Sequence, residues 1–357
     1  MQTALAPGLE ISKIITGLWQ IADIERKQEI DPKIFSRTID PYVEAGFTTF
    51  DMADHYGSSE LIMGHFNEQS ADSNIQLFTK WVPKPGSLSR EITKEAVHLA
   101  LRRLNKSSID LLQYHAWHYP NPSWLDALYY LKELKDEGLI KHIGVTNFDA
   151  AHLRIAKTSG IPIVSNQISH SLIDDRANTA DMIDVCTKHN IKLIAYGVVM
   201  GGFLTKKWLN KNEPNQENLS TWSEMKYKRF IDESGGWNSY QNLLSVVNKI
   251  ALNHNASIAN ICSKYILDNP RVSGIIIGAR LGQNDHIIDN QNILNIEITK
   301  SERNKIEEAQ KSLNSIPGNC GDEYRKAPFL TASGDLSHHY KKIPKVFDSM
   351  LVSKDRK

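Results

Sequence analysis

Cysteine is scarce in this sequence, and so is any excess of charge. Cys186, Cys262 and Cys320 are the 3 cysteines among 357 residues. Their odd number and wide spacing argue against a disulfide framework or a zinc site and suit a reducing cytosol. The formal net charge is +1, so no overall field would attract nucleic acid or an anionic membrane. We therefore expect a cytoplasmic protein with neither nucleic acid nor membrane among its partners.

Long apolar runs and a secretory leader are also lacking. No stretch approaches the ~18 apolar residues that a membrane-spanning helix needs. The first seven residues contain no basic region followed by an apolar run, so we expect no secretory signal. Hydrophobic residues make up 41% and charged residues 23% of the chain, which is typical of a globular protein with ample material for a core.

The glycine-rich fingerprint of a doubly wound sheet is missing as well. Such sheets usually carry G-x-G-x-x-G after the first strand, whereas residues 21–32 contain no glycine. Instead, short β-branched runs alternate with helical stretches whose apolar residues are spaced by three and four, as at residues 94–104, 124–137 and 257–267. We expect eight strands, at residues 14–21, 48–53, 75–81, 109–116, 142–147, 162–169, 192–198 and 274–279.

This alternation predicts the fold class. Parallel neighbouring strands need crossover connections, which the intervening helices supply. Eight strand–helix units predict an α/β protein whose parallel strands close into a (β/α)8 TIM barrel. We assign residues 1–314 to this barrel domain and residues 315–357 to a C-terminal extension that packs on or near it. A long polar insertion follows the seventh strand at residues 201–240; such loops are usually functional lids or disordered.

Ionisable side chains stand at the ends of three consecutive predicted strands, where the active site of a TIM barrel lies. Asp51 and Tyr56 follow the second strand, Lys80 ends the third and His115 ends the fourth. A phenol with a pKa of about 10 exchanges protons poorly near neutrality. A lysine ammonium beside it lowers that pKa, and Asp51 supplies the counter-charge that a buried Lys80 needs. We predict a proton-transfer device in which Tyr56 is the donor and His115 holds the substrate oxygen.

Each of these residues also has a purely structural interpretation. Asp51 could cap a helix, and Lys80 could face solvent as most lysines do. Tyr56 could be a loop aromatic and His115 a hydrogen-bonded core histidine. Their joint occurrence at three strand ends favours the functional interpretation, because the structural ones do not predict it.

A second histidine raises the question of a metal site. His118 lies three residues after His115, a spacing at which two histidines on one helix can share a metal. Pro120 and Pro122 follow at once, so this segment is a loop rather than a helix. We therefore expect no metal.

The motifs around these residues resemble those of the aldo-keto reductase superfamily, over roughly residues 9–313. The likeness lies in several ordered segments, GLWQIA, FDMADHYGSSELIMG, FTKW, IDLLQYHA and KDEGLIKHIGVTNF. The resemblance implies catalytic roles for Asp51, Tyr56, Lys80 and His115. It also implies an NAD(P)-dependent oxidoreductase with a TIM-barrel fold.

The same resemblance implies where a nicotinamide cofactor binds. The implied contacts are Thr146, Asn147, Gln167, Tyr196, Gly201, Gly202, Leu204, Arg280 and Asn290. Tyr196 would stack on the nicotinamide ring, since an aromatic face holds the ring flat and leaves one side open. Arg280 would bind the 2′-phosphate, which favours NADP (NADPH) and leaves NAD as the alternative. The segment GVVMGGFLT lacks the family's usual Ser-Pro-Leu but still resembles the loop that crosses the pyrophosphate.

The activity that the resemblance implies is the NADPH-dependent reduction of an aldehyde or ketone, including sugar-like ones, to an alcohol. Hydride would come from C4 of the cofactor and the proton from Tyr56. The predicted pocket wall contains Trp19, His55, Trp81 and Trp117, with tail residues near Tyr324 or Phe329 as further candidates. Its aromatic rings favour substrates with an apolar or sugar-like body. We expect a monomer or small homo-oligomer.

Two other functions stay open on the sequence. One is an NADP-binding regulatory or redox-sensing partner of another protein, with little turnover. The other is a barrel without redox function. Oxidation of bound NADPH by a simple aldehyde would distinguish the enzyme from the sensor, and the absence of any cofactor affinity would favour the third.

Overall fold

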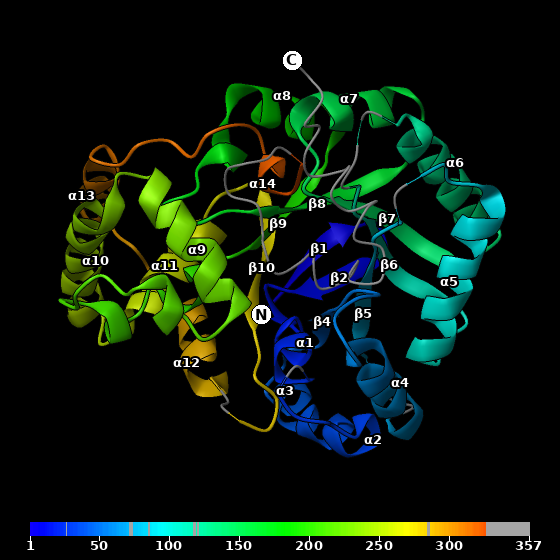
Figure 1. Ribbon diagram of the computed structural model, residues 1–357, viewed down its shortest axis with the longest axis horizontal. Coiled ribbons are helices and arrows are strands. Elements are labelled where there is room, and N and C mark those ends of the chain that lie inside the picture. The colour runs from blue at the N-terminus through cyan, green and yellow to red at the C-terminus, as the bar shows by residue number, and fades with distance from the viewer. Residues whose placement is uncertain are drawn as a thin grey trace.

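The computed structural model describes residues 1–25, 27–70, 74–84, 86–116, 119, 121–283 and 286–325 of the chain. A closed barrel of parallel strands lies at its centre, in the spatial order β10-β3-β4-β5-β6-β7-β8-β9 (Figure 1). Its strands are β3 (Ile14–Gly17), β4 (Thr49–Asp51), β5 (Gln76–Trp81), β6 (Ile109–Tyr114), β7 (Ile140–Thr146), β8 (Ile163–Ser169), β9 (Lys192–Tyr196) and β10 (Val272–Gly278). The predicted (β/α)8 fold is confirmed.

The barrel strands are buried on both faces. Helices cover the outside and side chains fill the interior, so every residue of β5 and β6 is buried. Phe78, Leu111 and Ile194, from three different strands, meet inside the barrel. The alternation of residues along each strand therefore decides which side chains point to the interior and, at the strand ends, into the mouth of the barrel.

An antiparallel hairpin, which the sequence analysis did not predict, precedes the barrel. It consists of β1 (Gln2–Ala6) and β2 (Leu9–Ser12). Leu5, Leu9 and Ile11 pack with the interior side chains Phe78 and Ile194. The hairpin therefore closes the N-terminal end of the barrel and leaves the opposite end as the open mouth.

Helices form the outer ring, in the order expected for strand–helix units (Figure 1). They include α4 (Ser59–Gln69), α5 (Arg90–Leu104), α6 (Ser123–Asp136), α7 (Ala150–Thr158), α8 (Ala180–His189), α11 (Ile258–Leu267) and α12 (Ile287–Asn292). Side-chain caps define several ends: Ser257 and Asn260 form a reciprocal capping box at the start of α11. Among the described residues, no helix is both long and apolar enough to span a membrane.

The first predicted strand was wrong at its C-terminal end. β3 stops at Gly17, and Ile21 lies in α1 (Gln20–Glu25). Leu18, Ile21 and Ile24 are all buried, a spacing of three that belongs to a helix rather than a strand. Two short helices, α2 (Pro32–Phe35) and α3 (Asp40–Glu44), then lead to β4.

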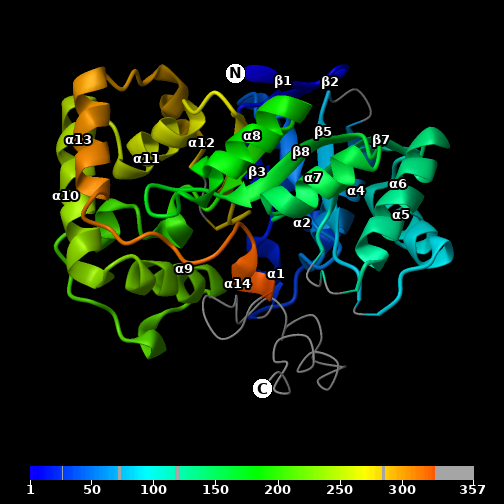
Figure 2. The ribbon, with the colours of Figure 1, turned by 90° about the horizontal axis from the view of Figure 1, so that it is seen from above.

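The long insertion is not the extended loop that its polar composition suggested. It contains α9 (Trp222–Glu233) and the start of α10 (Gly236–Asn253). Together with α13 (Lys300–Gln310), these helices form a block on one side of the barrel (Figures 1 and 2). Phe203, Phe230 and Tyr240 build a second hydrophobic cluster there, so the described part of the insertion is packed rather than disordered.

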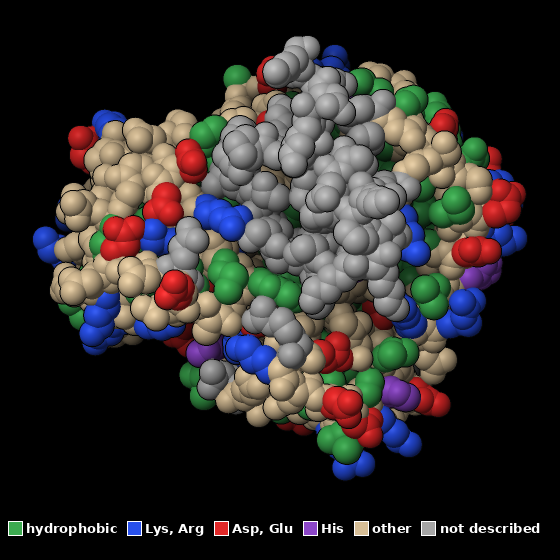
Figure 3. Space-filling model, viewed as in Figure 1, with side chains coloured by type: hydrophobic (Ala, Val, Ile, Leu, Met, Phe, Trp, Pro, Cys, Tyr) green, Lys and Arg blue, Asp and Glu red, His purple; other side chains and the backbone are tan. Residues whose placement is uncertain are grey.

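The described part of the C-terminal extension lies over the mouth of the barrel. Figure 2 shows α14 (Asp322–Arg325) on the side opposite the β1–β2 hairpin. Cys320, Glu323 and Tyr324 are buried, so this stretch is packed against the rest of the chain. Lys, Arg, Asp and Glu side chains are interspersed over the described part of the face seen in Figure 3, in keeping with a net charge of +1.

Candidate active site

A buried ion pair stands at the ends of β4 and β5. Lys80 Nζ lies 2.5 Å from Asp51 Oδ2 and 2.9 Å from the main-chain oxygen of Met52. Only 1% of the Lys80 side chain and 3% of that of Asp51 are exposed. Burial lowers the pKa of Lys80, and the charge of Asp51 opposes that shift. The pairing of Asp51 with Lys80 expected from the sequence is therefore present.

The second oxygen of Asp51 is held by two glutamines. Gln113 Nε2 donates to Asp51 Oδ1 at 2.9 Å and Gln167 Nε2 at 2.7 Å. Gln167 Nε2 also lies 2.9 Å from Gln113 Oε1. Three donors thus stabilise the carboxylate form of Asp51: Lys80 at Oδ2, and Gln113 and Gln167 at Oδ1. Gln113 was missed by the sequence analysis; a glutamine inside the apolar run of a buried strand was the signal for it.

Tyr56 lies beside the ammonium of this pair. Lys80 Nζ is 4.6 Å from the centroid of the Tyr56 ring. The rings of Trp19 and His55 pack edge-on against Tyr56, at centroid distances of 4.9 and 4.8 Å. Gly57 has a φ of +55°, in the left-handed region that glycine adopts without strain, so the turn that presents Tyr56 favours glycine there.

Asp54 and His55 form a second acid–base pair next to Tyr56. His55 Nδ1 lies 2.7 Å from Asp54 Oδ1, and the N–H of Val82 donates to Asp54 Oδ2 at 3.0 Å. Loss of solvent raises the pKa of Asp54 to about 7, against lowering by Arg103 and Lys80. The carboxyl group of Asp54 therefore changes charge in the range where imidazoles titrate.

His115 is a neutral imidazole in this site. Its Nε2 lies 3.2 Å from Asn147 Nδ2. Tyr196 OH donates to the Asn147 Oδ1 at 2.9 Å. Burial lowers the pKa of His115 well below its usual value, and the nearby cations Lys80 and Arg325 add to that shift.

Asn147 and its neighbour Thr146 occupy the end of β7. Asn147 has a φ of +57°, in the left-handed region that asparagine tolerates. Thr146 Oγ1 is buried and has no hydrogen-bond partner among the described residues. An unsatisfied buried hydroxyl at a strand end needs an explanation, and a polar group of a ligand at this position would supply one.

The predicted pyrophosphate loop follows β9. Gly201 and Gly202 have φ values of +62° and +96°, and a Cβ at Gly201 would lie 2.9 Å from the main chain of Ser223. Glycine is therefore needed for the path of this loop. The side chain of Leu204 is buried in the second hydrophobic cluster with Phe203, so only its main chain is available to a ligand.

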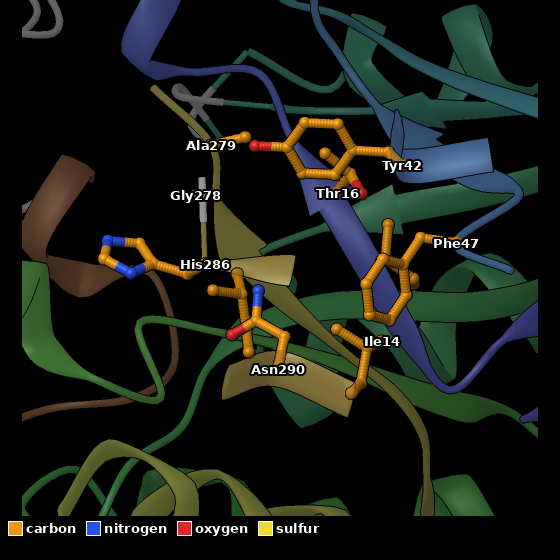
Figure 4. Close-up of a pocket in the computed structure, with 10 residues that line it drawn as sticks. Ile14, Thr16, Tyr42, Phe47, Gly278, Ala279, His286 and Asn290 are labelled. Atoms are coloured by element: carbon orange, nitrogen blue, oxygen red, sulfur yellow. The ribbon is translucent and has the colours of Figure 1, made fainter. Parts of the chain in front are cut away.

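Arg280 and Asn290 lie beyond the end of β10. Arg280 Nη2 is 3.2 Å from Asp23 Oδ2, with 30% of the arginine side chain exposed. Figure 4 shows Asn290 beside His286 at a small cavity that Tyr42 also lines. Arg280 thus already faces a carboxylate, and Asn290 lines a cavity with Ala279, the residue before Arg280.

The predicted pocket residues separate into three groups. Trp19 and His55 lie at Tyr56, whereas Trp81 is buried in the core and packs on Tyr114 at 5.5 Å between ring centroids. Trp117 lies outside the described residues. Trp222 of α9 was not singled out as a pocket residue, yet its ring lies 5.6 Å from that of Trp19.

The C-terminal extension contributes a further ring. The Tyr324 ring is 5.3 Å from the His115 ring, in an edge-on arrangement. Tyr324 OH accepts from Lys226 Nζ at 2.6 Å. An aromatic residue in a polar tail is the sequence signal that indicates Tyr324 as a pocket residue. Within the described ranges, no group of three or more His, Cys, Asp or Glu side chains could hold a metal ion.

Solved structures of other proteins share this architecture. The glycerol dehydrogenase AKR11B4 from Gluconobacter oxydans matches with a TM-score of 0.71 and 22% identity, over 87% of this chain and 95% of that one. The thermostable aldo-keto reductase Tm1743 matches with a TM-score of 0.64 and 22% identity, over 87% and 99% of the two chains. At this identity the likeness shows the fold.

Sequence comparison identifies the family. The chain is 27% identical over 285 residues to the aldo-keto reductase YhdN of Bacillus subtilis, covering 76% of this chain and 82% of that protein. It is 26% identical over 312 residues to protein tas of Escherichia coli, covering 76% and 86%. The model of the aldo/keto reductase family matches residues 13–311 of this chain. The protein is therefore an oxidoreductase of the aldo/keto reductase family.

Proposed function

We propose that this protein reduces an aldehyde or ketone to an alcohol with NADPH, and that Tyr56 donates the proton. The observation that carries the proposal is the position of the Lys80 ammonium. It is buried, held by Asp51 at 2.5 Å and lies 4.6 Å from the centre of the Tyr56 ring. A fixed cation beside a phenol stabilises the phenolate that remains after proton donation.

His115 has a complementary task in this proposal. Its imidazole is neutral, because burial keeps the pKa low, and its Nε2 contacts Asn147. The one N–H of a neutral imidazole can donate to the oxygen of a carbonyl and orient it, without competing with Tyr56 as an acid. The separation of tasks follows from environment: one group sits beside an ammonium and the other in a buried amide network.

The residues present fit a nicotinamide cofactor. Thr146 Oγ1 is a buried hydroxyl lacking a partner in the described residues, as expected for a group that binds a carboxamide. Gly201 and Gly202 let the main chain after β9 approach a pyrophosphate closely, and Arg280 offers a guanidinium at the barrel edge. When bound, the cofactor supplies the hydride.

The rings around Tyr56 favour flat or apolar carbonyl compounds. Trp19 and Trp222 meet on one side of the site and Tyr324 packs on His115 on the other. Aromatic walls bind planar or apolar surfaces and sugar faces better than small, strongly hydrated aldehydes. Benzaldehyde derivatives are therefore suitable first substrates.

The test is NADPH oxidation by 4-nitrobenzaldehyde, followed at the nicotinamide absorbance and repeated with NADH. We expect turnover by the wild type, and a loss on the order of 10²- to 10⁴-fold in kcat for Tyr56→Phe with NADPH binding retained. Tyr129→Phe is the matched control, since Tyr129 is exposed and its hydroxyl donates to the main-chain oxygen of Ser159. Near-full activity of Tyr56→Phe would overturn the assignment of the proton donor.

A further inference from the structure

Arg325, in the C-terminal extension, bridges the ends of two barrel strands. Its Nη2 donates to the main-chain oxygen of Asn147 at 2.8 Å and to that of Cys320 at 2.7 Å. Its Nη1 lies 3.3 Å from the main-chain oxygen of Ala116. One guanidinium thus joins the residue after His115, the residue after Thr146 and the extension itself.

The carbonyl that Arg325 holds belongs to the residue that connects the site. The side chain of Asn147 contacts His115 on one side and Tyr196 on the other. Its N–H donates to the main-chain oxygen of Gln167 at 2.8 Å. Because the φ of Asn147 is left-handed, its carbonyl and side chain keep their directions only if both are held.

The extension is itself fixed to the barrel, so Arg325 is held on a rigid support. Arg176 Nη1 donates to Glu323 Oε2 at 2.7 Å and to the main-chain oxygen of Asn319 at 2.9 Å. The same guanidinium pairs with Asp174, and all three charged side chains are at most 4% exposed. A buried network of this kind leaves little freedom to the segment that carries Arg325.

Two features match Arg325 to its place. The face of its guanidinium lies 4.3 Å from the Tyr119 ring centroid, an arrangement that an arginine adopts better than a lysine. Gly321 has a φ of +83°, and a Cβ there would lie 2.4 Å from the Asn147 oxygen. The main chain of the extension therefore approaches Asn147 as closely as glycine permits.

We propose that Arg325 is a positioning residue for the reaction: it locks the Asn147 carbonyl and so aims the Asn147 carboxamide between His115 and Tyr196. The inference rests on the proposed function for its catalytic consequence. The extension would then be part of the catalytic framework. A guanidinium suits this place because its N–H groups stand on separate nitrogens with fixed directions, whereas the three donors of a lysine radiate from one atom.

The test compares Arg325→Ala and Arg325→Lys with the wild type, in the full chain. We expect Arg325→Ala to lower kcat for 4-nitrobenzaldehyde by roughly 10- to 100-fold, as small misplacements near the chemistry do, with a smaller change in NADPH affinity. Added guanidinium ion should restore part of that activity, whereas equal ionic strength from sodium chloride should not. Arg303→Ala is the matched control, because Arg303, near the start of α13, also covers a ring, that of Tyr265.

Hydrogen–deuterium exchange gives a readout that does not depend on turnover. We expect faster exchange in Arg325→Ala for the peptide covering β7 and Asn147, and no change there in Arg303→Ala. Gly321→Ala, which retains the arginine, should raise the same exchange by displacing the Asn147 carbonyl.

The outcomes separate this inference from the proposed function. If the wild type is active, two results would overturn the positioning role alone. One is an unchanged kcat in Arg325→Ala, and the other is a lowered kcat in Arg325→Ala that added guanidinium ion does not restore. If the wild type fails to oxidise NADPH with every carbonyl compound tested, the proposed function is overturned. The exchange data would still decide whether Arg325 holds Asn147. Unchanged exchange at β7 in both Arg325→Ala and Gly321→Ala would overturn the inference directly.

Discussion

The strand ends and the appended segments build the two halves of this site in different ways. On the strands, register decides position: Asp51 pairs with Phe78, two residues before Lys80, and Lys80 pairs with Gln113. These side chains therefore lie at neighbouring levels of one interior face. In the other half, Trp222 comes from the insertion at residues 201–240. Tyr324 comes from the described part of the C-terminal extension, residues 315–325.

Long-range contacts position that second half. Glu323 meets Arg176 across 147 residues of sequence, and Arg325 meets Asn147 across 178. No strand register constrains such pairs, so each depends on buried charges and carbonyls that find specific partners. The difference teaches that the proton-transfer residues belong to the fold itself, whereas the walls of the pocket and the placement of Asn147 depend on segments added to it.

Removing the ammonium at the strand ends should have the largest effect. We expect Lys80→Met to lower kcat on the order of 10²- to 10⁴-fold, because Tyr56 loses the cation beside it. Asp51 would keep its two glutamine donors but lose its counter-ion, at a stability cost of roughly 3–5 kcal/mol. Steady-state kinetics and urea unfolding measure the two effects separately. A folded Lys80→Met with kcat within threefold of wild type would contradict the strand-end half of the comparison.

Breaking the anchor of the extension should have an intermediate effect. Glu323→Ala leaves Arg176 paired with Asp174 alone, and we expect a loss of roughly 3 kcal/mol of unfolding free energy with about a tenfold lower kcat. Asp184→Ala is the control, because its pair with Arg154 is exposed and worth at most about 1 kcal/mol. Equal stability losses in the two variants would show that the extension is not held by its buried charges.

The smallest effect should come from the Asp54 carboxyl group. Its pKa is raised from 3.8 to about 7, so the folded protein binds this proton more tightly than the unfolded chain does. That contribution favours folding at low pH and is lost as the pH rises from about 4 to about 7.

Asp54→Asn should remove this dependence. We expect the stability difference between the variant and the wild type to shift in favour of the variant between pH 5 and pH 8, by roughly 2–3 kcal/mol. Urea midpoints at the two pH values measure it. A difference that stays constant, or shifts toward the wild type, would contradict the raised pKa.

Much of the fold was predictable, and the misses have local causes. Short β-branched apolar runs and the helical spacing between them placed the barrel strands within a few residues, because both patterns are set by neighbours in the chain. The first strand was extended too far because apolar residues continue from β3 into α1 without a break. The N-terminal hairpin was missed, since two short strands carry little periodic signal of their own.

The chain by itself determined the barrel, the family and the set of ionisable side chains at the strand ends, because these follow from local spacing and strand register. Only the tertiary structure decided that Gln113 completes the Asp51 site, that Trp222 joins Trp19, and that Arg325 holds Asn147. Those contacts join residues far apart in sequence, and no local pattern specifies the partner that a buried amide, ring or guanidinium will meet.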